Sequence, residues 1–194
     1  MDPFATFMWK RIIIQIGAIV AIAAVLGAFV LAYNAAYNQV AGLDQIADER
    51  WARLSLDLQE RYAGIPSLGR AIGPSLGADH PVLDEVMADL DRWEAAMGKG
   101  DLGKIDIATA NLEDSISRLV TAMQNHPGIV ASTVPREFLD GLKSTGEAIP
   151  GDRLSFNDGV MRYNQAISTF PASLWVENWG FPARGYFNAS IGGK

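Results

Sequence analysis

The sequence contains no cysteine and only two histidines, His80 and His126. Without cysteine the chain has no disulfide, no thiolate nucleophile and no zinc–thiolate site. Each histidine directly precedes a proline, and neither has a second histidine three or four positions away, as a metal site on a helix would need. Helix capping or exposure to solvent is the better interpretation of both, and we expect no metal site.

Basic residues are also scarce. The chain has 16 Lys and Arg against 22 Asp and Glu, which gives a formal net charge of −6. Nucleic acids and anionic lipid headgroups are bound mainly through Lys and Arg. The composition therefore argues against a nucleic-acid partner.

Motifs of known catalytic chemistry are missing as well. The adjacent carboxylates Asp84-Glu85 and Glu113-Asp114 fan out around a helix and do not converge. The Glu-x-x-His motif of di-iron bundles is absent, as are nucleophile elbows and zinc-protease motifs. We therefore expect a protein that is not an enzyme and holds no cofactor.

One segment partly imitates a phosphate-binding loop. Residues 98–104 have its glycine and lysine spacing, but Ile105 stands where a Ser or Thr hydroxyl would hold Mg²⁺. The segment also follows a predicted helix, whereas a phosphate loop follows a strand. A simple turn between two helices is the better interpretation.

Charge is absent from residues 12–32, a run of 21 residues in which Gln15 is the only polar side chain. Twelve of them are Ile, Val, Leu or Phe, which together favour insertion into a bilayer by roughly 4 to 7 kcal/mol. As a helix the run is about 31 Å long, enough to cross the hydrocarbon core. A buried core helix is rarely so uniformly apolar, and a signal peptide has a shorter apolar region of about 7 to 15 residues. We predict a single transmembrane helix.

The flanks of this run predict its orientation. Lys10 and Arg11 directly precede it, whereas the first basic residue after it is Arg50. The positive-inside rule then places residues 1–11 in the cytoplasm and the large domain on the other side of the membrane. In a Gram-negative bacterium that side is the periplasm.

The transmembrane helix has no obvious end. Residues 33–63 contain no proline, and apolar residues recur at steps of three and four from Val40 to Tyr62. Proline and glycine between residues 65 and 80 predict a short helix and turns. Further amphipathic helices are predicted over residues 81–97, 104–124 and 138–170, the last with a kink or brief interruption at Pro150-Gly151.

Four apolar-faced helices with short connections, and no alternating strand pattern, predict an all-α antiparallel four-helix bundle continuous with the transmembrane helix. The predicted bundle covers residues 33–171 and is followed by a tail, residues 172–194. The tail is too aromatic for a disordered segment, and we expect it to dock on the bundle or on a partner. Its aromatic residues are Trp175, Trp179, Phe181, Tyr186 and Phe187.

Pairs of an aromatic residue and an asparagine recur within the predicted helices. Asparagine is a mediocre helix former, so its recurrence there needs a reason. Hydrogen bonds between helices that fix their register are one explanation, and a ligand site is the alternative. The pairs are Tyr33-Asn34, Tyr37-Asn38, Phe156-Asn157 and Tyr163-Asn164.

The order and spacing of these features resemble the LemA family of bacterial membrane proteins. The resemblance covers nearly the whole chain and implies an N-terminally anchored antiparallel helical bundle in the bacterial cytoplasmic membrane. It brings no catalytic site with it. The resemblance is that of a divergent member, since Gly73-Pro74 and Pro150-Gly151 interrupt regions where the family usually has uninterrupted helix. The matching residues, besides the apolar run, are Tyr37-Asn38, Trp51, Leu54, Leu58, Arg61, Ile65-Pro66-Ser67-Leu68, Leu112, Arg118-Leu119, Pro127, Phe138, Leu142, Glu147, Ile149, Arg153, Phe156-Asn157, Tyr163-Asn164, Phe170-Pro171, Gly180-Phe181 and Tyr186-Phe187.

Two functions agree with these features. The first is a structural or scaffold subunit that docks on a larger membrane protein complex, for example a respiratory or photosynthetic one, and stabilises it. Ala24, Ala28, Ala32 and Ala36, spaced by four, would let a partner's transmembrane helix approach closely. The alternative is a ligand-binding or signalling module that uses a groove in the bundle near the asparagines. The expected partners are the lipid bilayer and other integral membrane proteins.

Overall fold

The structure is a computed structural model that describes residues 3–76 and 80–192. Over these residues it is all-helical and contains no strand, as the apolar periodicity predicts. The chain divides into two compact units, which are described separately. Unit 1 contains Met1–Leu43 and Asn164–Ala183, and unit 2 contains Asp44–Tyr163 and Arg184–Lys194.

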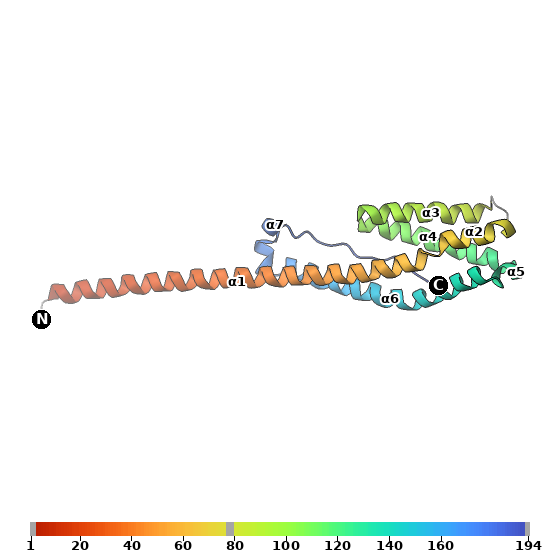
Figure 1. The fold of residues 1–194 in the computed structure, drawn as a ribbon. Helices are drawn as coiled ribbons and strands as arrows, with labels where there is room; N and C mark the ends of the chain where they lie inside the picture. The colour runs from red at the N-terminus through yellow and green to blue at the C-terminus, as the bar shows by residue number, and fades with distance from the viewer. Residues whose placement is uncertain (1–2, 77–79, 193–194) are drawn as a thin grey trace. The chain divides into compact units, whose positions relative to one another are not determined.

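Helix α1 spans Pro3–Tyr62 and contributes residues to both units (Figure 1). The prediction that the apolar run continues without a break as a helix is therefore confirmed. Every side chain from residue 13 to residue 35 is exposed. Within the described residues, α1 lies in the one helical stretch that is long and apolar enough to cross a membrane. The side chains of Lys10 and Arg11, on which the predicted orientation depends, lie outside the described part.

Helix α2 spans Ile65–Leu76 and belongs to unit 2. Its length exceeds the short helix and turns that proline and glycine predict, and Pro74 lies inside it. Pro74 removes one backbone hydrogen bond, but Ile65, Leu68 and Ile72 recur at helical spacing and are fully buried. Burial of this apolar face outweighs the lost hydrogen bond.

Helix α3 (Pro81–Lys99) and helix α4 (Leu102–Gln124) lie side by side as an antiparallel hairpin (Figure 1). Their bounds lie within two residues of the predicted ones. The short helix α5 (Pro127–Val130) follows and packs against α4. Each helix of the hairpin thus contributes one apolar face to the core of unit 2.

Helix α6 spans Thr133–Ser168 and continues through Pro150, so the interruption that was one of the two predicted alternatives, a kink or a brief interruption, does not occur. Its first part, up to Tyr163, packs against α1 in unit 2. The two helices approach closely at Gly159, where an added Cβ would lie 3.1 Å from Cδ of Arg50 and 3.6 Å from Cα of Ala47. The continuous apolar register of α6 therefore overrides the proline, because it lets both halves of the helix bury one face.

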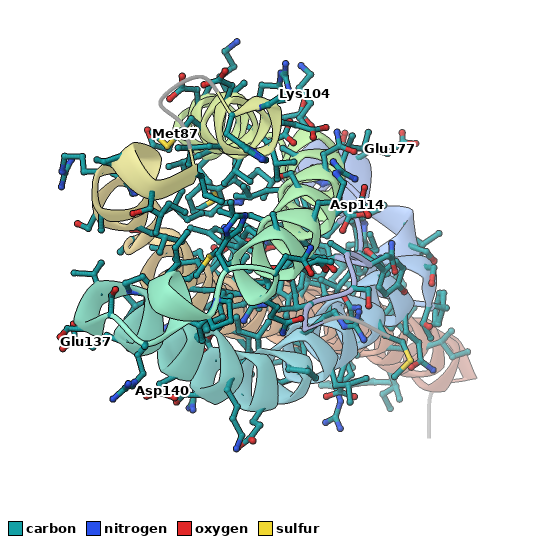
Figure 2. The ribbon with its side chains drawn as sticks, turned by 90° about the vertical axis from the view of Figure 1, so that its right-hand side faces the viewer. Met87, Lys104, Asp114, Glu137, Asp140 and Glu177 are labelled. Atoms are coloured by element: carbon teal, nitrogen blue, oxygen red, sulfur yellow. The ribbon has the colours of Figure 1, made fainter. Side chains whose placement is uncertain are left out.

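The core of unit 2 draws on α1 to α6 and on the last residues of the chain. Figure 2 shows charged side chains such as Glu137 and Asp140 at the periphery. The buried core residues come from every helix of the unit. They are Leu54, Leu58, Tyr62, Ile65, Leu68, Ile72, Leu83, Val86, Leu90, Trp93, Ala96, Ile105, Ala108, Leu112, Ile116, Leu119, Met123, Ile129, Phe138, Ile149, Phe156, Val160, Phe187, Ala189 and Ile191.

Unit 1 combines α1 up to Leu43 with the end of α6, the 3-10 helix η1 (Ala172–Leu174) and the short helix α7 (Val176–Trp179). Gly180, with φ of 74°, ends α7 in the left-handed conformation that glycine adopts without strain. In Figure 1, α7 lies beside the middle of α1.

Candidate functional site

The most highly organised polar site of unit 2 surrounds residues 184–192, which we call the tail segment. These residues form no helix, and their side chains alternate as in an extended strand. Phe187, Ala189 and Ile191 are buried with exposed fractions of 0%, 5% and 8%. Asn188 and Ser190 between them are exposed, as is Tyr186 before them. The tail segment therefore completes the core of unit 2 with every second side chain.

The backbone of the tail segment is bound by side chains of α4 and α6. Asn157 Nδ2 donates to the carbonyl oxygen of Phe187 at 2.8 Å, and Asn157 Oδ1 accepts from the amide of Phe187 at 3.0 Å. Asp106 Oδ1 accepts from the amides of Asn188 and Ala189, at 2.7 and 2.6 Å. Arg153 Nη1 donates to the carbonyl oxygen of Ala189 at 2.9 Å. These side chains satisfy main-chain groups that have no helix or sheet partner.

A buried ion pair lies at the far end of the tail segment. Arg61 of α1 and Glu113 of α4 meet in two parallel hydrogen bonds of 2.6 and 2.8 Å, with only 3% and 9% of their side chains exposed. Arg61 Nη1 also donates to the carbonyl oxygen of Leu142 and to Thr145 of α6, at 2.7 and 2.9 Å. Glu113 accepts from the backbone amide of Gly192 at 3.3 Å. The pair thus joins α1, α4, α6 and the tail segment.

Tyr62 completes this network. Its hydroxyl donates to Glu113 Oε1 at 2.8 Å, and its ring packs edge-on against Trp93 with centroids 4.9 Å apart. Burial, together with the negative charge of Glu113, raises the pKa of Tyr62 well above its ordinary value of 10.0. Tyr62 is therefore a hydrogen-bond donor and stays neutral at physiological pH.

Arg184 attaches the near end of the tail segment to α1. Its guanidinium bonds to Asp44 and Asp48 at 2.7 Å each and lies over the ring of Tyr163, 5.4 Å from the centroid. Burial alone would lower the pKa of Arg184, but its hydrogen bonds to Asp48 and Asp44 raise it. Arg184 therefore stays protonated, because two carboxylates one helical turn apart stabilise its charge.

Unit 1 contains a second organised site, made of rings. Trp175 packs edge-on against Phe29 and Tyr33, with centroids 5.4 and 5.1 Å apart. Trp179 packs against Tyr33 and Tyr37 at 5.3 and 5.4 Å, and its Nε1 donates to the Tyr33 hydroxyl at 2.8 Å. We call Phe29, Tyr33, Tyr37, Trp175, Trp179 and Phe181 the aromatic ladder, since Phe181 in turn contacts Tyr37.

The predicted aromatic tail residues fall into these two sites. Trp175, Trp179 and Phe181 contact α1 in unit 1, whereas Phe187 enters the core of unit 2, with its ring centroid 6.0 Å from that of Trp51. Tyr186 remains 44% exposed.

The aromatic–asparagine pairs fulfil different roles. Tyr37 belongs to the aromatic ladder, and Asn38 beside it is exposed. Asn34 donates to the carbonyl oxygen of Val30 one turn earlier in its own helix. The structure thus differs from the expected hydrogen bonds between helices.

In α6, Phe156 and Tyr163 are buried. Asn157 binds the backbone of the tail segment, and Asn164 is half-buried. Helical spacing could not show that the partner of Asn157 is an extended segment, because nothing in a helical pattern indicates what lies opposite a polar residue.

Sequence reasoning also missed Arg61, Glu113, Asp106 and Arg184. Glu113 and Asp114 point in different directions around α4, as expected, but each can therefore contact a different neighbouring element. The available signal was the placement of Glu113 one residue after Leu112 on the apolar side of α4. A charged residue at the border of an apolar stripe is often paired.

The turn that imitates a phosphate-binding loop binds the chain's own carboxylate. Gly100, with φ of 67°, ends α3, and the Asp101 side chain accepts from the amide of Lys104 at 3.2 Å. Lys104 Nζ pairs with Asp101 at 3.0 Å. These hydrogen bonds lower the pKa of Asp101. Asp101 thus occupies the place an anion would take, as in an ordinary helix N-cap.

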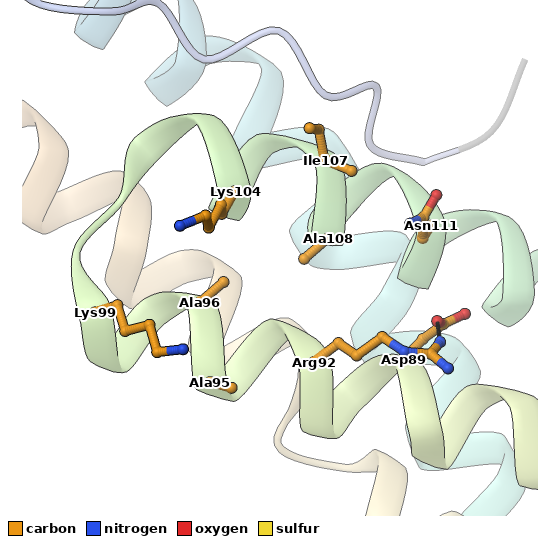
Figure 3. A pocket seen from close by; sticks show the side chains of 9 residues that line it. All are labelled: Asp89, Arg92, Ala95, Ala96, Lys99, Lys104, Ile107, Ala108 and Asn111. Atoms are coloured by element: carbon orange, nitrogen blue, oxygen red, sulfur yellow. Dashed lines mark hydrogen bonds and ion pairs between the residues drawn. The ribbon is translucent and has the colours of Figure 1, made fainter.

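A surface pocket of about 320 Å³ lies between α3 and α4 next to this turn (Figure 3). Lys99, Lys104 and Asn111 line it, and Arg92 is ion-paired with Asp89. Ala95, Ala96, Ile107 and Ala108 also line it. The pocket is an open gap between two helices that small alanine side chains leave unfilled.

The two histidines begin helices but do not cap them. His80 precedes α3 and His126 precedes α5, and neither side chain makes a capping hydrogen bond. His126 is exposed and His80 is half-buried. Among the described residues, no three His, Asp or Glu side chains form a group suited to a metal ion.

Fold and site together define an all-helical protein with a long apolar N-terminal helix and a carboxy-terminal segment bound by its own helices. The LemA family model matches residues 50–193, about three quarters of the chain. The protein belongs to the LemA family, so the resemblance seen in the sequence is confirmed. The matched region includes Arg61, Glu113 and the whole tail segment. No curated protein matches the chain.

Proposed function

We propose that the protein is a non-enzymatic, membrane-anchored structural subunit that docks on a larger membrane protein complex and stabilises it. The observation that carries this proposal is the exposure of the apolar part of α1. Ile14, Val25 and Leu31 are 69%, 69% and 72% exposed, and no charged residue lies between residues 12 and 43. Burial of such side chains is worth about 25 cal/mol per Å² of apolar surface, so they need a bilayer or another helix.

The chain then spans a bacterial cytoplasmic membrane once. Lys10 and Arg11 hold the N-terminus in the cytoplasm, and α1 carries the helices of unit 2 on the periplasmic side as an antiparallel four-helix bundle of α1, α3, α4 and α6. Alkylation of a single introduced cysteine tests this topology in intact cells, because the chain has none of its own. A cysteine at exposed Leu154 should react with a membrane-impermeant reagent, and failure to react in intact but not in lysed cells would reverse the topology.

The docking face for a partner helix is the alanine row of α1. Ala24, Ala28 and Ala32 are exposed, whereas Ala36, only 5% exposed, is covered within the chain itself. Small side chains let two transmembrane helices approach closely, so that van der Waals packing holds them. We therefore propose that the partner contact covers residues 24–32 and ends before Ala36.

Purification in mild detergent after cross-linking in native membranes tests this function. Ala28→Leu should lose the co-purifying membrane protein, because leucine separates the helices. Ala23→Leu, about 140° around the helix from Ala28, is the matched control and should retain it. Recovery of free monomer alone from the parent protein, or retention of the partner by both variants, would contradict the proposal.

The alternative function, a ligand-binding module, takes a specific form in this structure. Asn157 and Asp106 bind a main chain and not a side chain, so the same groove suits an extended peptide. A partner peptide would have to displace the tail segment. Fluorescence polarisation of a labelled peptide with the sequence of residues 184–192 tests this, and no binding to full-length Phe187→Ala protein would exclude it.

A further inference from the structure

A second membrane contact follows from unit 1. We infer that residues 170–181, which we call the foot, lie in the outer interface of the bilayer beside the transmembrane helix, as a second and non-spanning anchor. This inference rests on the proposed span of α1. It concerns different residues, however, and can fail while the span stands.

The depth of the foot follows from the contacts of the aromatic ladder. Phe29 lies inside the apolar run and contacts Trp175. Tyr33 and Tyr37 follow one and two turns later, roughly 6 and 12 Å further along the helix axis. Trp179 contacts both tyrosines. Trp175 is therefore beside the last turn of the apolar run, and Trp179 lies one turn further out.

The direction of the chain brings further apolar residues toward the lipid. From Trp175 to Phe181 the chain moves along α1 away from the apolar run, since their partners progress from Phe29 to Tyr37. The residues just before Trp175 are then nearest the hydrocarbon. Phe170 and Leu174 among them are 74% and 59% exposed, large for apolar side chains that meet only water.

The composition of the foot suits an interface. Tryptophan and tyrosine gather where hydrocarbon meets headgroups, because their rings are apolar and their N–H or O–H groups are polar. Glu177 is the only charged residue from 164 to 183. Without a cation, the foot cannot depend on anionic lipid. The occupant of its exposed face is therefore the zwitterionic or uncharged interface itself.

The exposed fractions of two neighbouring residues of α1 show that the chain itself does not cover the aromatic ladder on the side of the proposed span. Phe29 remains 54% exposed after its contact with Trp175, and neighbouring Val30 is 56% exposed. Leu174 and Trp175 therefore extend an apolar surface that already belongs to the proposed span. A bilayer that covers Val30 also reaches the foot.

Spin labelling of the full-length chain tests the inference, because each cysteine introduced into this cysteine-free protein is unique. The protein is reconstituted in phosphatidylcholine vesicles, with and without phosphatidylglycerol. The measured quantity is the accessibility of the nitroxide to oxygen relative to a water-soluble nickel chelate. Leu174→Cys reports the foot and Ile22→Cys reports the span. Leu154→Cys, at a leucine that is 67% exposed in unit 2, is the matched aqueous control.

The label at residue 174 should show a several-fold higher ratio than the label at 154, and a lower ratio than the label at 22, in both kinds of vesicle. Equal ratios at 174 and 154, with a high ratio at 22, would overturn the foot and leave the proposed span intact. A low ratio at 22 would overturn the span as well. A ratio at 174 that rises only with phosphatidylglycerol would also contradict the foot.

A second variant separates contact with lipid from chance exposure. Trp175→Ala in the Leu174→Cys protein removes the contact with Phe29, so the label should become more accessible to the chelate. Trp9→Ala, at a tryptophan that is 66% exposed, should leave the label unchanged. If Trp175→Ala had no more effect than Trp9→Ala, the ladder would not be what holds the foot against the membrane.

Discussion

Units 1 and 2 each hold a carboxy-terminal segment against α1, but they do so with different chemistry. In unit 1 the contacts are rings, with the hydrogen bond between Trp179 and Tyr33 among them. In unit 2 the contacts include carboxylates and guanidinium groups, such as Arg184 with Asp44 and Asp48. Charges are costly near lipid and useful in water, so the difference agrees with the proposal that unit 1 lies beside a membrane and unit 2 lies in solvent.

The comparison also indicates how each unit should respond to its surroundings. Charge-assisted hydrogen bonds depend on pH and, where exposed, on salt, whereas ring contacts depend on neither. Substitutions in one unit should therefore leave the carboxy-terminal segment of the other in place. Four predictions test this, and each can be followed by hydrogen exchange of residues 170–181 against residues 184–192.

The largest effect is expected for Glu113→Gln. The substitution leaves the guanidinium of Arg61 buried without its counter-charge, which typically costs about 3 to 5 kcal/mol. Urea unfolding of the full-length protein in micelles measures it. Glu85→Gln is the control, because Glu85 pairs with Arg118 at the surface, with 46% of its side chain exposed. Equal decreases in the free energy of unfolding of the two variants would show that burial of the Arg61–Glu113 pair does not increase its contribution to stability.

Asn157→Leu should have the next largest effect. It leaves the amide and carbonyl groups of Phe187 without partners, at a cost of about 2 kcal/mol. Exchange should accelerate in residues 184–192 and stay unchanged in residues 170–181. The same substitution at exposed Asn111 should alter neither segment. If both segments of the Asn157→Leu protein exchanged faster, the two units would not be independent.

Trp179→Ala should have a smaller effect on the other segment: exchange should accelerate in residues 170–181 and stay unchanged in residues 184–192. Loss of the ring contacts with Tyr33 and Tyr37 should favour local opening of residues 170–181 by about 1 to 2 kcal/mol. Added sodium chloride should not change this difference, and urea unfolding of unit 2 should be unaffected. A salt-dependent effect would mean that charge contributes to unit 1 after all.

The smallest effect is expected from Asp158 at acid pH. Hydrogen bonds from Arg50 and then Arg162 lower the pKa of Asp158 from 3.8. Its contribution to stability is therefore complete above this ordinary value, which holds in the unfolded chain, and is lost as the pH falls through the lower folded value. Asp158→Asn should flatten the acid limb of the unfolding midpoint slightly. A steeper acid limb in the Asp158→Asn protein would reverse the sign of this argument.

Much of the fold could be predicted from the sequence because helices are local. Apolar residues at steps of three and four, together with proline and glycine at the ends, place α3 and α4 within two residues. The exceptions are α2 and α6, where Pro74 and Pro150 lie inside helices. In both helices, burial of an apolar face along the whole segment outweighs the cost of the internal proline. The proline is evident from the sequence, whereas the extent of burial is not.

The polar site around the tail segment was much less predictable. Asn157 stood out in the sequence because asparagine is unusual inside a helix, but its partner lies 30 residues further on. Asp106 and Glu113 were ordinary acidic residues of a helix. Their roles depend on an extended segment that is distant in the sequence and that tertiary packing brings to α4.

By itself the sequence determined the all-helical class, the exposed apolar helix and the lack of thiol chemistry, since these depend on composition and on spacing within a few residues. Only the tertiary structure decided that Trp175 contacts Phe29 and that Arg61 meets Glu113. Such pairs join residues 146 and 52 positions apart, and their partners are selected by packing of whole helices. Sequence patterns within a few residues do not determine that packing.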